Sequence, residues 1–150
     1  MWEDAKQAVL DSSLSSSVYI GTDSIRFKRD GKWFARYATV VVVHKDSMHG
    51  CRIFYHADTL QDYGDLKSRL LNEVNFAVQA AVEIAEVLGE RHLEVHLDLN
   101  NDPKHKSHCA VKEAVGWVMG MGFEPVIKPD GWAATHAADH CARSKTFAVR

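Results

Sequence analysis

The hydrophobic pattern of this chain changes its period near Tyr63, and that change limits the folds open to it. Before this point, apolar residues occur in short β-type runs, including four successive valines at residues 40–43. After it, apolar side chains recur every three or four residues as far as Leu88, which predicts one long amphipathic helix. Its apolar stripe consists of Leu66, Leu70, Val74, Ala77, Ala81, Ala85 and Leu88. Glu73 falls on the buried flank of this stripe, unlike the other acids of the helix.

Three strands are predicted before the long helix, at residues 18–22, 33–44 and 51–56. Asp30-Gly31 is a hairpin signal between the first two, and polar residues 45–50 turn the chain before the third. Such short connections make the three strands an antiparallel meander. A short helix is expected ahead of them, in the first eleven residues.

Strands and helices alternate in the second half of the chain. We expect a strand at residues 93–99, a helix at 107–121 with Ser107 as its N-cap, a strand at 123–128 and a last helix at 132–143. The element order is therefore βββαβαβα. Connections through helices imply right-handed parallel crossovers. This order predicts an α/β fold, with a mixed five-stranded sheet and helices on its faces.

Length and composition favour one soluble domain. The chain has 150 residues, of which 46% are hydrophobic, so we expect a single domain over residues 1–150 with residues 1–17 as an N-terminal extension. The formal net charge of −2 means that a nucleic-acid partner would need a local basic patch or a metal ion. Three cysteines without CxxC spacing and the absence of a long apolar run favour a cytoplasmic protein with free thiols.

Two of the predicted strands end in acids. Asp23 follows the first strand, and Asp98 lies near the end of the fourth. Because these strands would be parallel neighbours, their carboxyl ends would meet where open α/β sheets place their sites. Glu73 projects from the helix that covers the sheet, and Asp139 lies three residues after His136 on one face of the last helix.

Carboxylates gathered in this way would repel one another by several kcal/mol in a protein interior. Asp23 must therefore either accept hydrogen bonds from a turn or hold a cation. Oxygen ligands suit Mg²⁺ or Mn²⁺. Two such ions about 4 Å apart can activate a water and stabilise the leaving oxygen in phosphodiester hydrolysis.

The element order and the positions of the acids resemble the ribonuclease H fold. Four short motifs also resemble the YkuK family, small bacterial and phage proteins described as ribonuclease H-like. They are YIGTDS at residues 19–24, LLNEV at 70–74, EVHLDLN at 94–100 and KPDGWAA at 128–134. The resemblance extends from Val18 to about Arg143, and the joint order of the motifs is more specific than any one of them.

By position, the resemblance implies that Asp23 bridges two metal ions and that Asp98 is the acid of the fourth strand. Glu73 matches the helix acid of ribonuclease H proper, which RuvC-type members lack. His136 and Asp139 are similar to two ligands in the last helix of RuvC-type resolvases, although Asp139 lies about two turns into its helix. No basic handle with interleaved aromatic residues is visible, so recognition of RNA–DNA hybrids is not implied.

Ordinary structural roles remain open for several of these residues. Asp98 could cap the end of its strand, and Glu73 could extend from the helix edge into solvent. Asp139 could pair with Arg143 one turn later. Asp130 could cap the last helix, or could replace Asp139 as the ligand from this part of the chain.

Four polar residues are predicted to bind substrate: Lys104, Lys106 and Lys128, as contacts to its phosphates, and Asn100. Asp102 lies in the same loop, and a polar loop can also be simply solvated. A zinc site made by His136 and His140 with Asp139 or Cys141 is a competing possibility. It lacks the glutamate that accompanies this histidine spacing in metalloproteases.

The leading expectation is a metal-dependent nuclease that uses a two-metal mechanism with Mg²⁺ or Mn²⁺. Asp23 and Asp98 would align the attacking water. Glu73, Asp139 and His136 would complete the metal shell or carry protons. The alternative is a non-catalytic ribonuclease H-like module that binds nucleic acid or a protein partner.

Overall fold

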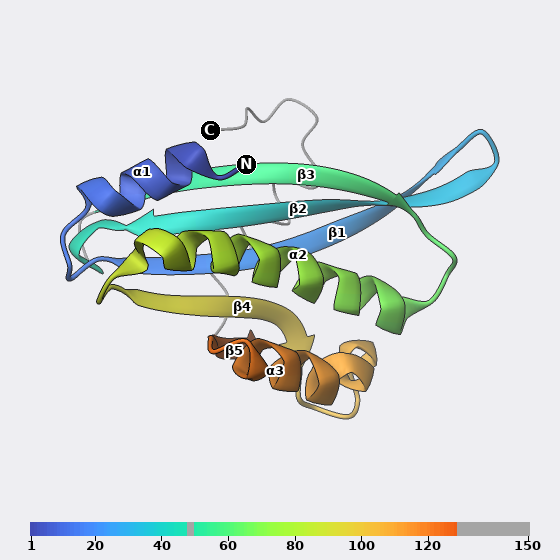
Figure 1. Ribbon diagram of the computed structural model, residues 1–150. Helices are drawn as coiled ribbons and strands as arrows, with labels where there is room; N and C mark the ends of the chain where they lie inside the picture. The colour runs from blue at the N-terminus through green and yellow to red at the C-terminus, as the bar shows by residue number, and fades with distance from the viewer. Residues whose placement is uncertain (48–49, 129–150) are drawn as a thin grey trace.

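The computed structural model describes residues 1–47 and 50–128. A mixed five-stranded sheet forms one layer, and helices pack against it (Figure 1). The strands are β1 (Ser17–Arg29), β2 (Lys32–His44), β3 (Cys51–Gln61), β4 (His92–Asn100) and β5 (Glu124–Lys128). The α-helices are α1 (Glu3–Asp11), α2 (Leu66–Leu88) and α3 (Val111–Gly120), and two 3-10 helices are η1 (Lys45–Ser47) and η2 (Lys106–Ala110). The predicted last helix lies outside the described residues.

The strand order across the sheet is β3-β2-β1-β4-β5. β2 is antiparallel to both β1 and β3, whereas β4 is parallel to both β1 and β5. The two parallel connections run through α2 and through α3, as the sequence pattern requires. The predicted α/β fold with a mixed five-stranded sheet is confirmed.

The first two strands are longer than the hydrophobic pattern predicts. β1 continues to Arg29 and pairs with β2 along its whole length, down to Arg29 opposite Lys32. Asp30 (φ 52°) and Gly31 (φ 78°) make the turn, both with the positive φ that a type I′ hairpin requires. Since β4 pairs with β1 only up to Gly21, the end of this hairpin projects beyond the parallel part of the sheet (Figure 1).

All three described α-helices pack on one face of the sheet. Every second residue of β4 enters this core, from Leu93 to Leu99, and meets the buried side of α2. Near the end of α2 this side includes the fully buried Ile84, whereas Ala85 of the predicted stripe is exposed. α2 ends where Gly89 adopts a positive φ of 60°. Residues of the predicted N-terminal extension also belong to this core, since the side chains of Trp2, Ala5, Ala8 and Val9 are buried in it.

Two local predictions are wrong. Ser107 does not cap a helix: it lies within η2, and its hydroxyl accepts a hydrogen bond from the backbone N–H of Asn100 at 3.0 Å. The apolar spacing of the predicted helix at 107–121 would also bury Met119, but this residue is 62% exposed, because α3 turns its Ala114 and Val118 side toward the sheet. None of the helices in the described part of the chain is long and apolar enough to cross a membrane.

Candidate active site

The first two predicted acids lie where β1 and β4 part. Parallel pairing of these strands ends at Gly21 opposite His96. Asp23 and Asp98 each stand two residues further along, so an unbroken ladder would have placed them opposite each other. Asp23 is half-buried, and its Oδ1 accepts a hydrogen bond of 2.9 Å from the N–H of Ser24. The structure therefore places both strand acids just beyond the point where the pairing of β1 and β4 ends.

The side chain of Glu73 extends from α2 toward the point where β1 and β4 part. Its side chain is 7% exposed, and its carboxylate accepts a hydrogen bond of 2.5 Å from the hydroxyl of Ser24. The adjacent Asn72 donates to the phenol oxygen of Tyr37 at 3.1 Å, which fixes this turn of α2 against β2. A small pocket is lined by Glu73, Thr22, His96, Asp98 and apolar residues of α2 and β4. Glu73 is thus buried, and the alternative in which it extends into solvent is wrong.

The environment of Glu73 opposes its ionisation. Burial raises the pKa of its carboxyl group well above the ordinary value, and the negative charge of Asp23 raises it further. Asp98 acts in the same direction. The hydrogen bond from Ser24 and the positive charge of Arg69 partly offset these effects. A buried acid that keeps its proton at higher pH, beside two others, is typical of a functional site.

Lys128 occupies a position that its sequence context does not reveal. It was predicted to contact substrate phosphates, but its ammonium group forms an ion pair with Oδ1 of Asp98. A register shift between β4 and β5 places Lys128 opposite Asn100, within reach of Asp98. The pKa of Lys128 is raised, mainly by its hydrogen bond to Asp98. Lys128 therefore neutralises part of the charge that the predicted cations would neutralise.

The remaining predicted residues divide into two groups. Lys104 and Lys106 are exposed in the loop after β4, and this loop is organised by its own side chains. Asn100 accepts a hydrogen bond from the N–H of Asp102 at 2.8 Å, and Asp102 accepts one from the N–H of Lys104 at 3.0 Å. The other group, which lies outside the described residues, consists of Asp130, His136, Asp139, His140 and Cys141.

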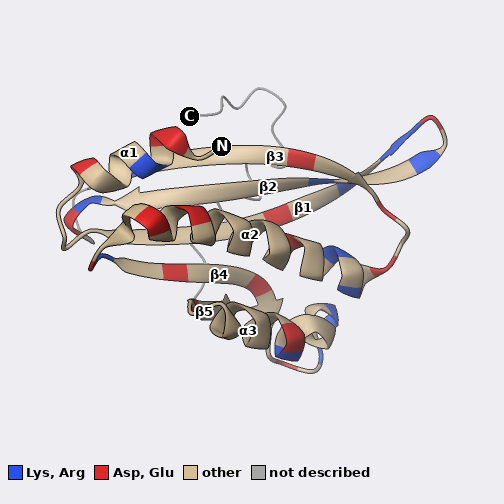
Figure 2. Ribbon diagram, viewed as in Figure 1, with Lys and Arg blue, Asp and Glu red and all other residues tan. Residues whose placement is uncertain are grey.

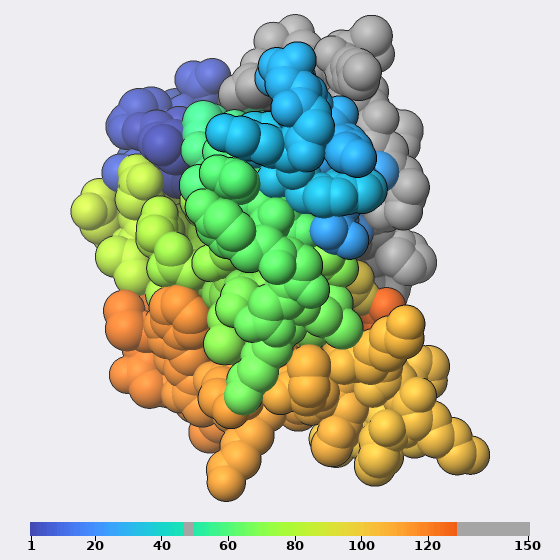
Figure 3. Space-filling model, turned by 90° about the vertical axis from the view of Figure 1, so that its right-hand side faces the viewer, coloured from blue at the N-terminus to red at the C-terminus, as the bar shows by residue number. Residues whose placement is uncertain are grey.

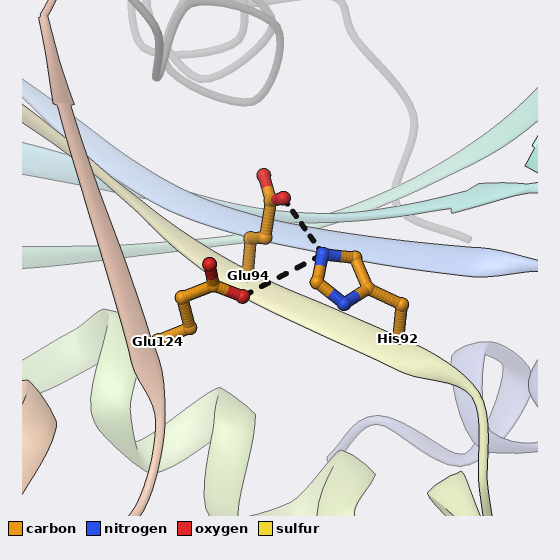
Figure 4. Close-up of side chains that lie close together, drawn as sticks. All are labelled: His92, Glu94 and Glu124. Atoms are coloured by element: carbon orange, nitrogen blue, oxygen red, sulfur yellow. Dashed lines mark hydrogen bonds and ion pairs between the residues drawn. The ribbon is translucent and has the colours of Figure 1, made fainter.

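A second polar cluster, which was not predicted, lies at the other end of β4. His92 Nε2 is 2.7 Å from an oxygen of Glu94 and 3.6 Å from an oxygen of Glu124 (Figure 4). Glu94 also contacts Nε2 of the buried His96 at 2.9 Å. Burial acts to raise the pKa of Glu94, but the hydrogen bonds with His92 and His96 lower it overall. Asp98 lies six positions after His92, about 20 Å along a strand, so this cluster is distinct from the acids.

This second cluster had a visible signal in the sequence. In β4, alternate residues from His92 to Asn100 are polar, and their neighbours are apolar. One face of the strand is therefore polar from end to end, even though β4 lies between β1 and β5.

The oxygen donors of the predicted site are of the kind that Mg²⁺ or Mn²⁺ prefers. Asp23, Glu73 and Asp98 come from three different elements, and they would hold such ions. Among the described residues, His92, Glu94 and Glu124 form the group whose ligand atoms all lie within 4.8 Å of one another, and the three acids are set wider than this. A cation held by these acids would compete with Lys128 for Asp98.

The fold belongs to the ribonuclease H-like class of α/β folds. This class is indicated by the strand order, by the parallel pairing of β1 with β4, and by the acids where these two strands part. A family profile described as Ribonuclease H-like matches residues 1–143, so this chain belongs to that family. One similar solved structure is the protease-reverse transcriptase of prototype foamy virus, with 14% identity and a TM-score of 0.45. The match covers 93% of this chain and 22% of the viral chain. Among curated protein sequences, none matches.

Proposed function

We propose that this protein is a metal-dependent nuclease that hydrolyses phosphodiester bonds of nucleic acid. The observation that carries the proposal is the buried Glu73 carboxyl group, held beside Asp23 and Asp98 where β1 and β4 part. No packing requirement explains three acids from three elements at this point, and their mutual repulsion costs stability. Such an arrangement is retained where the charges serve a ligand.

Each acid has a distinct part in this proposal. Asp23 and Asp98 hold one or two Mg²⁺ or Mn²⁺ ions, which would supply activation of a water and stabilisation of the leaving oxygen. Glu73, positioned by Ser24, is the third ligand or carries a proton, and its raised pKa suits either part. His136 and Asp139 complete the set in our proposal, in keeping with the resemblance to RuvC-type members. Within the family, the four motifs support membership of the YkuK-like group.

The test is cleavage of labelled single-stranded RNA, single-stranded DNA, RNA–DNA hybrid, duplex DNA and a four-way junction, with Mg²⁺ or Mn²⁺. We expect cleavage of at least one substrate, abolished by EDTA and reduced at least 100-fold in an Asp23→Asn variant. Glu124→Gln is the matched control, because it removes a carboxylate from the second cluster and should leave cleavage unchanged. If no substrate is cut, or if Asp23→Asn cuts as fast as the wild type, the proposal is wrong.

One observation favours the alternative, a non-catalytic module on the same fold. Lys128 already forms an ion pair with Asp98, as a substitute for a cation would. Calorimetric titration with Mn²⁺ separates the two functions. A nuclease should bind two ions per chain, and Lys128→Gln should strengthen the binding. A non-catalytic module in which Lys128 takes the place of the metal should bind no Mn²⁺ at the acids, except in the Lys128→Gln variant.

A further inference from the structure

The hairpin formed by β1 and β2 carries a local positive charge that the net charge of the chain conceals. Residues 26–36 contain five Lys or Arg residues and one Asp, a net charge of +4 in a chain whose total is −2. Blue bands mark these residues on the projecting arm in Figure 2. Figure 3 looks toward this end of the molecule, where the light-blue atoms of the hairpin lie at the surface.

Strand alternation sorts the hairpin residues onto two faces, and one of these faces contains Asp23. Along β1 the same face continues through Ile25 and Phe27 to Arg29. The residues of β2 that pair with these four β1 residues lie on the same face. Starting from the partner of Asp23, they are Ala38, Arg36, Phe34 and Lys32. With a rise of about 3.3 Å per residue, the cation Arg36 follows Asp23 at about 7 Å, and the cationic pair Arg29 and Lys32 follows at about 20 Å. A continuous surface therefore leads outward from the acids and becomes positively charged.

Aromatic rings give this face its shape. Phe27 and Phe34 lie against each other with centroids 5.8 Å apart and planes at 23°. The guanidinium carbon of Arg29 lies 5.3 Å above the ring of Phe27. Such contacts hold the arginine in an extended position while its charge stays in solvent. The prediction that this chain lacks a basic segment with interleaved aromatic residues is therefore wrong, because Phe27, Trp33 and Phe34 lie among the five basic residues of residues 26–36.

Two of the charges on this face, those of the exposed Arg29 and Lys32, have no acidic partner within residues 1–47 and 50–128. Arg36 is half-buried, and its Nε is buried without a hydrogen-bond acceptor. Arg26, on the opposite face, differs because it pairs with Asp62 and lies over Trp33. A second copy of the chain would bring like charges together here. The chemistry that fits is a flexible polyanion.

We propose that this hairpin face, comprising Arg29, Lys32 and Arg36, binds the phosphate backbone of a nucleic-acid strand. The direction of the strand, from the acids outward along the hairpin, rests on the proposed nuclease function, whereas the binding itself does not. Contacts to phosphates carry little sequence information and depend strongly on salt. The hairpin therefore holds the substrate in place without selecting its sequence.

The test is fluorescence anisotropy with a labelled 20-nucleotide single strand and a 20-base-pair duplex, in protein that carries Asp23→Asn to prevent cleavage. The hairpin variant combines Arg29→Gln, Lys32→Gln and Arg36→Gln. A control variant removes equal charge elsewhere, at the exposed residues Lys45, Arg52 and Lys112. Circular dichroism confirms that each variant is folded, and a charge-conserving Arg29→Lys/Lys32→Arg variant should bind like the parent protein.

Three lost contacts to a single strand reduce the slope of log K against log[salt] by about 2. Between 50 and 200 mM salt, the parent protein should therefore lose about 20-fold more affinity than the hairpin variant. A higher affinity for the duplex than for the single strand at equal salt would identify duplex backbone as the better ligand of this face. Equal affinity and slope in the parent and the hairpin variant would overturn the inference, as would an equal loss in the control variant.

Failure of this inference can be distinguished from failure of the nuclease function. If wild-type protein cleaves and the three hairpin substitutions leave KM unchanged, the hairpin inference is wrong and the nuclease function stands. If the hairpin binds strands as expected but wild-type protein cleaves none of them, the nuclease function is wrong and the hairpin inference stands.

Discussion

Glu73→Gln should make the metal-free protein more stable at pH 8. The substitution keeps the shape of the side chain and an oxygen that can accept the hydrogen bond from Ser24, but it removes a buried negative charge. An uncompensated buried charge costs several kcal/mol, and here Arg69 and Ser24 offset part of that cost. We therefore expect a gain of about 1–3 kcal/mol in the free energy of unfolding. For a domain of this size that corresponds to about 3–10 °C in Tm.

The gain should depend on pH in a defined direction. The folded protein holds the proton of Glu73 more tightly than the unfolded chain, in which the pKa is about 4.3. The contribution of Glu73 to wild-type stability is therefore fully present below this value and is lost as the pH rises through the raised pKa. At pH 4 most of the wild-type side chain is protonated in both states, so wild type and variant should be nearly equally stable.

Thermal unfolding followed by circular dichroism in EDTA, at pH 4 and pH 8, measures both effects. Glu86→Gln is the matched control on the same helix, since that carboxylate is exposed and pairs with Lys6, and its removal should change stability by less than about 1 kcal/mol. Adding Mg²⁺ at pH 8 should stabilise the wild type more than Glu73→Gln. The reasoning is refuted if Glu73→Gln is less stable than wild type at pH 8, or if the difference is the same at both pH values.

Three further substitutions test other parts of the structure. Lys128→Gln should lower metal-free stability by about 1 kcal/mol, because it leaves Asp98 without its ion pair, as urea denaturation would measure; unchanged stability would show that the pair contributes nothing. Ile84→Ala should cost about 2–5 kcal/mol in the same assay, because the side chain is fully buried against the sheet, and a loss below 1 kcal/mol would contradict that packing. Arg91→Ala should speed amide exchange in α1, because the guanidinium donates to the carbonyl oxygens of Ser12 (2.7 Å) and of the end of α2; unaltered exchange in residues 3–11 would show that α1 is held by its apolar side chains alone.

Most of the fold follows from local patterns in the sequence. The alternation of apolar residues in β4 and the helical stripe of α2 each point to a single buried face, and together they fix the order of strands and helices. Asp30-Gly31 gave the hairpin turn correctly. The length of β1 was missed because its outer half is charged, and only pairing with β2 makes it a strand. The β-propensity of single residues does not reveal that the outer half of β1 pairs with β2.

The site was predictable to the same extent. The positions of Asp23 and Asp98 followed from topology, because parallel neighbouring strands end at one edge, and the burial of Glu73 followed from its place beside the apolar stripe of α2. The position of Lys128 could not, since it depends on the register shift between β4 and β5. The His92, Glu94 and Glu124 cluster depends on side-chain directions across two strands, although the polar alternation of β4 was a usable signal. Averaging charge over the chain hid the basic hairpin.

The most direct test of the central claim is the position of bound Mn²⁺, located by anomalous diffraction from a soaked crystal. The claim that the acids form a metal-dependent site predicts a peak between Asp23 and Asp98, with Glu73 beside it and Lys128 displaced from Asp98. A peak confined to His92, Glu94 and Glu124, or no peak while Lys128 remains paired with Asp98, would contradict it.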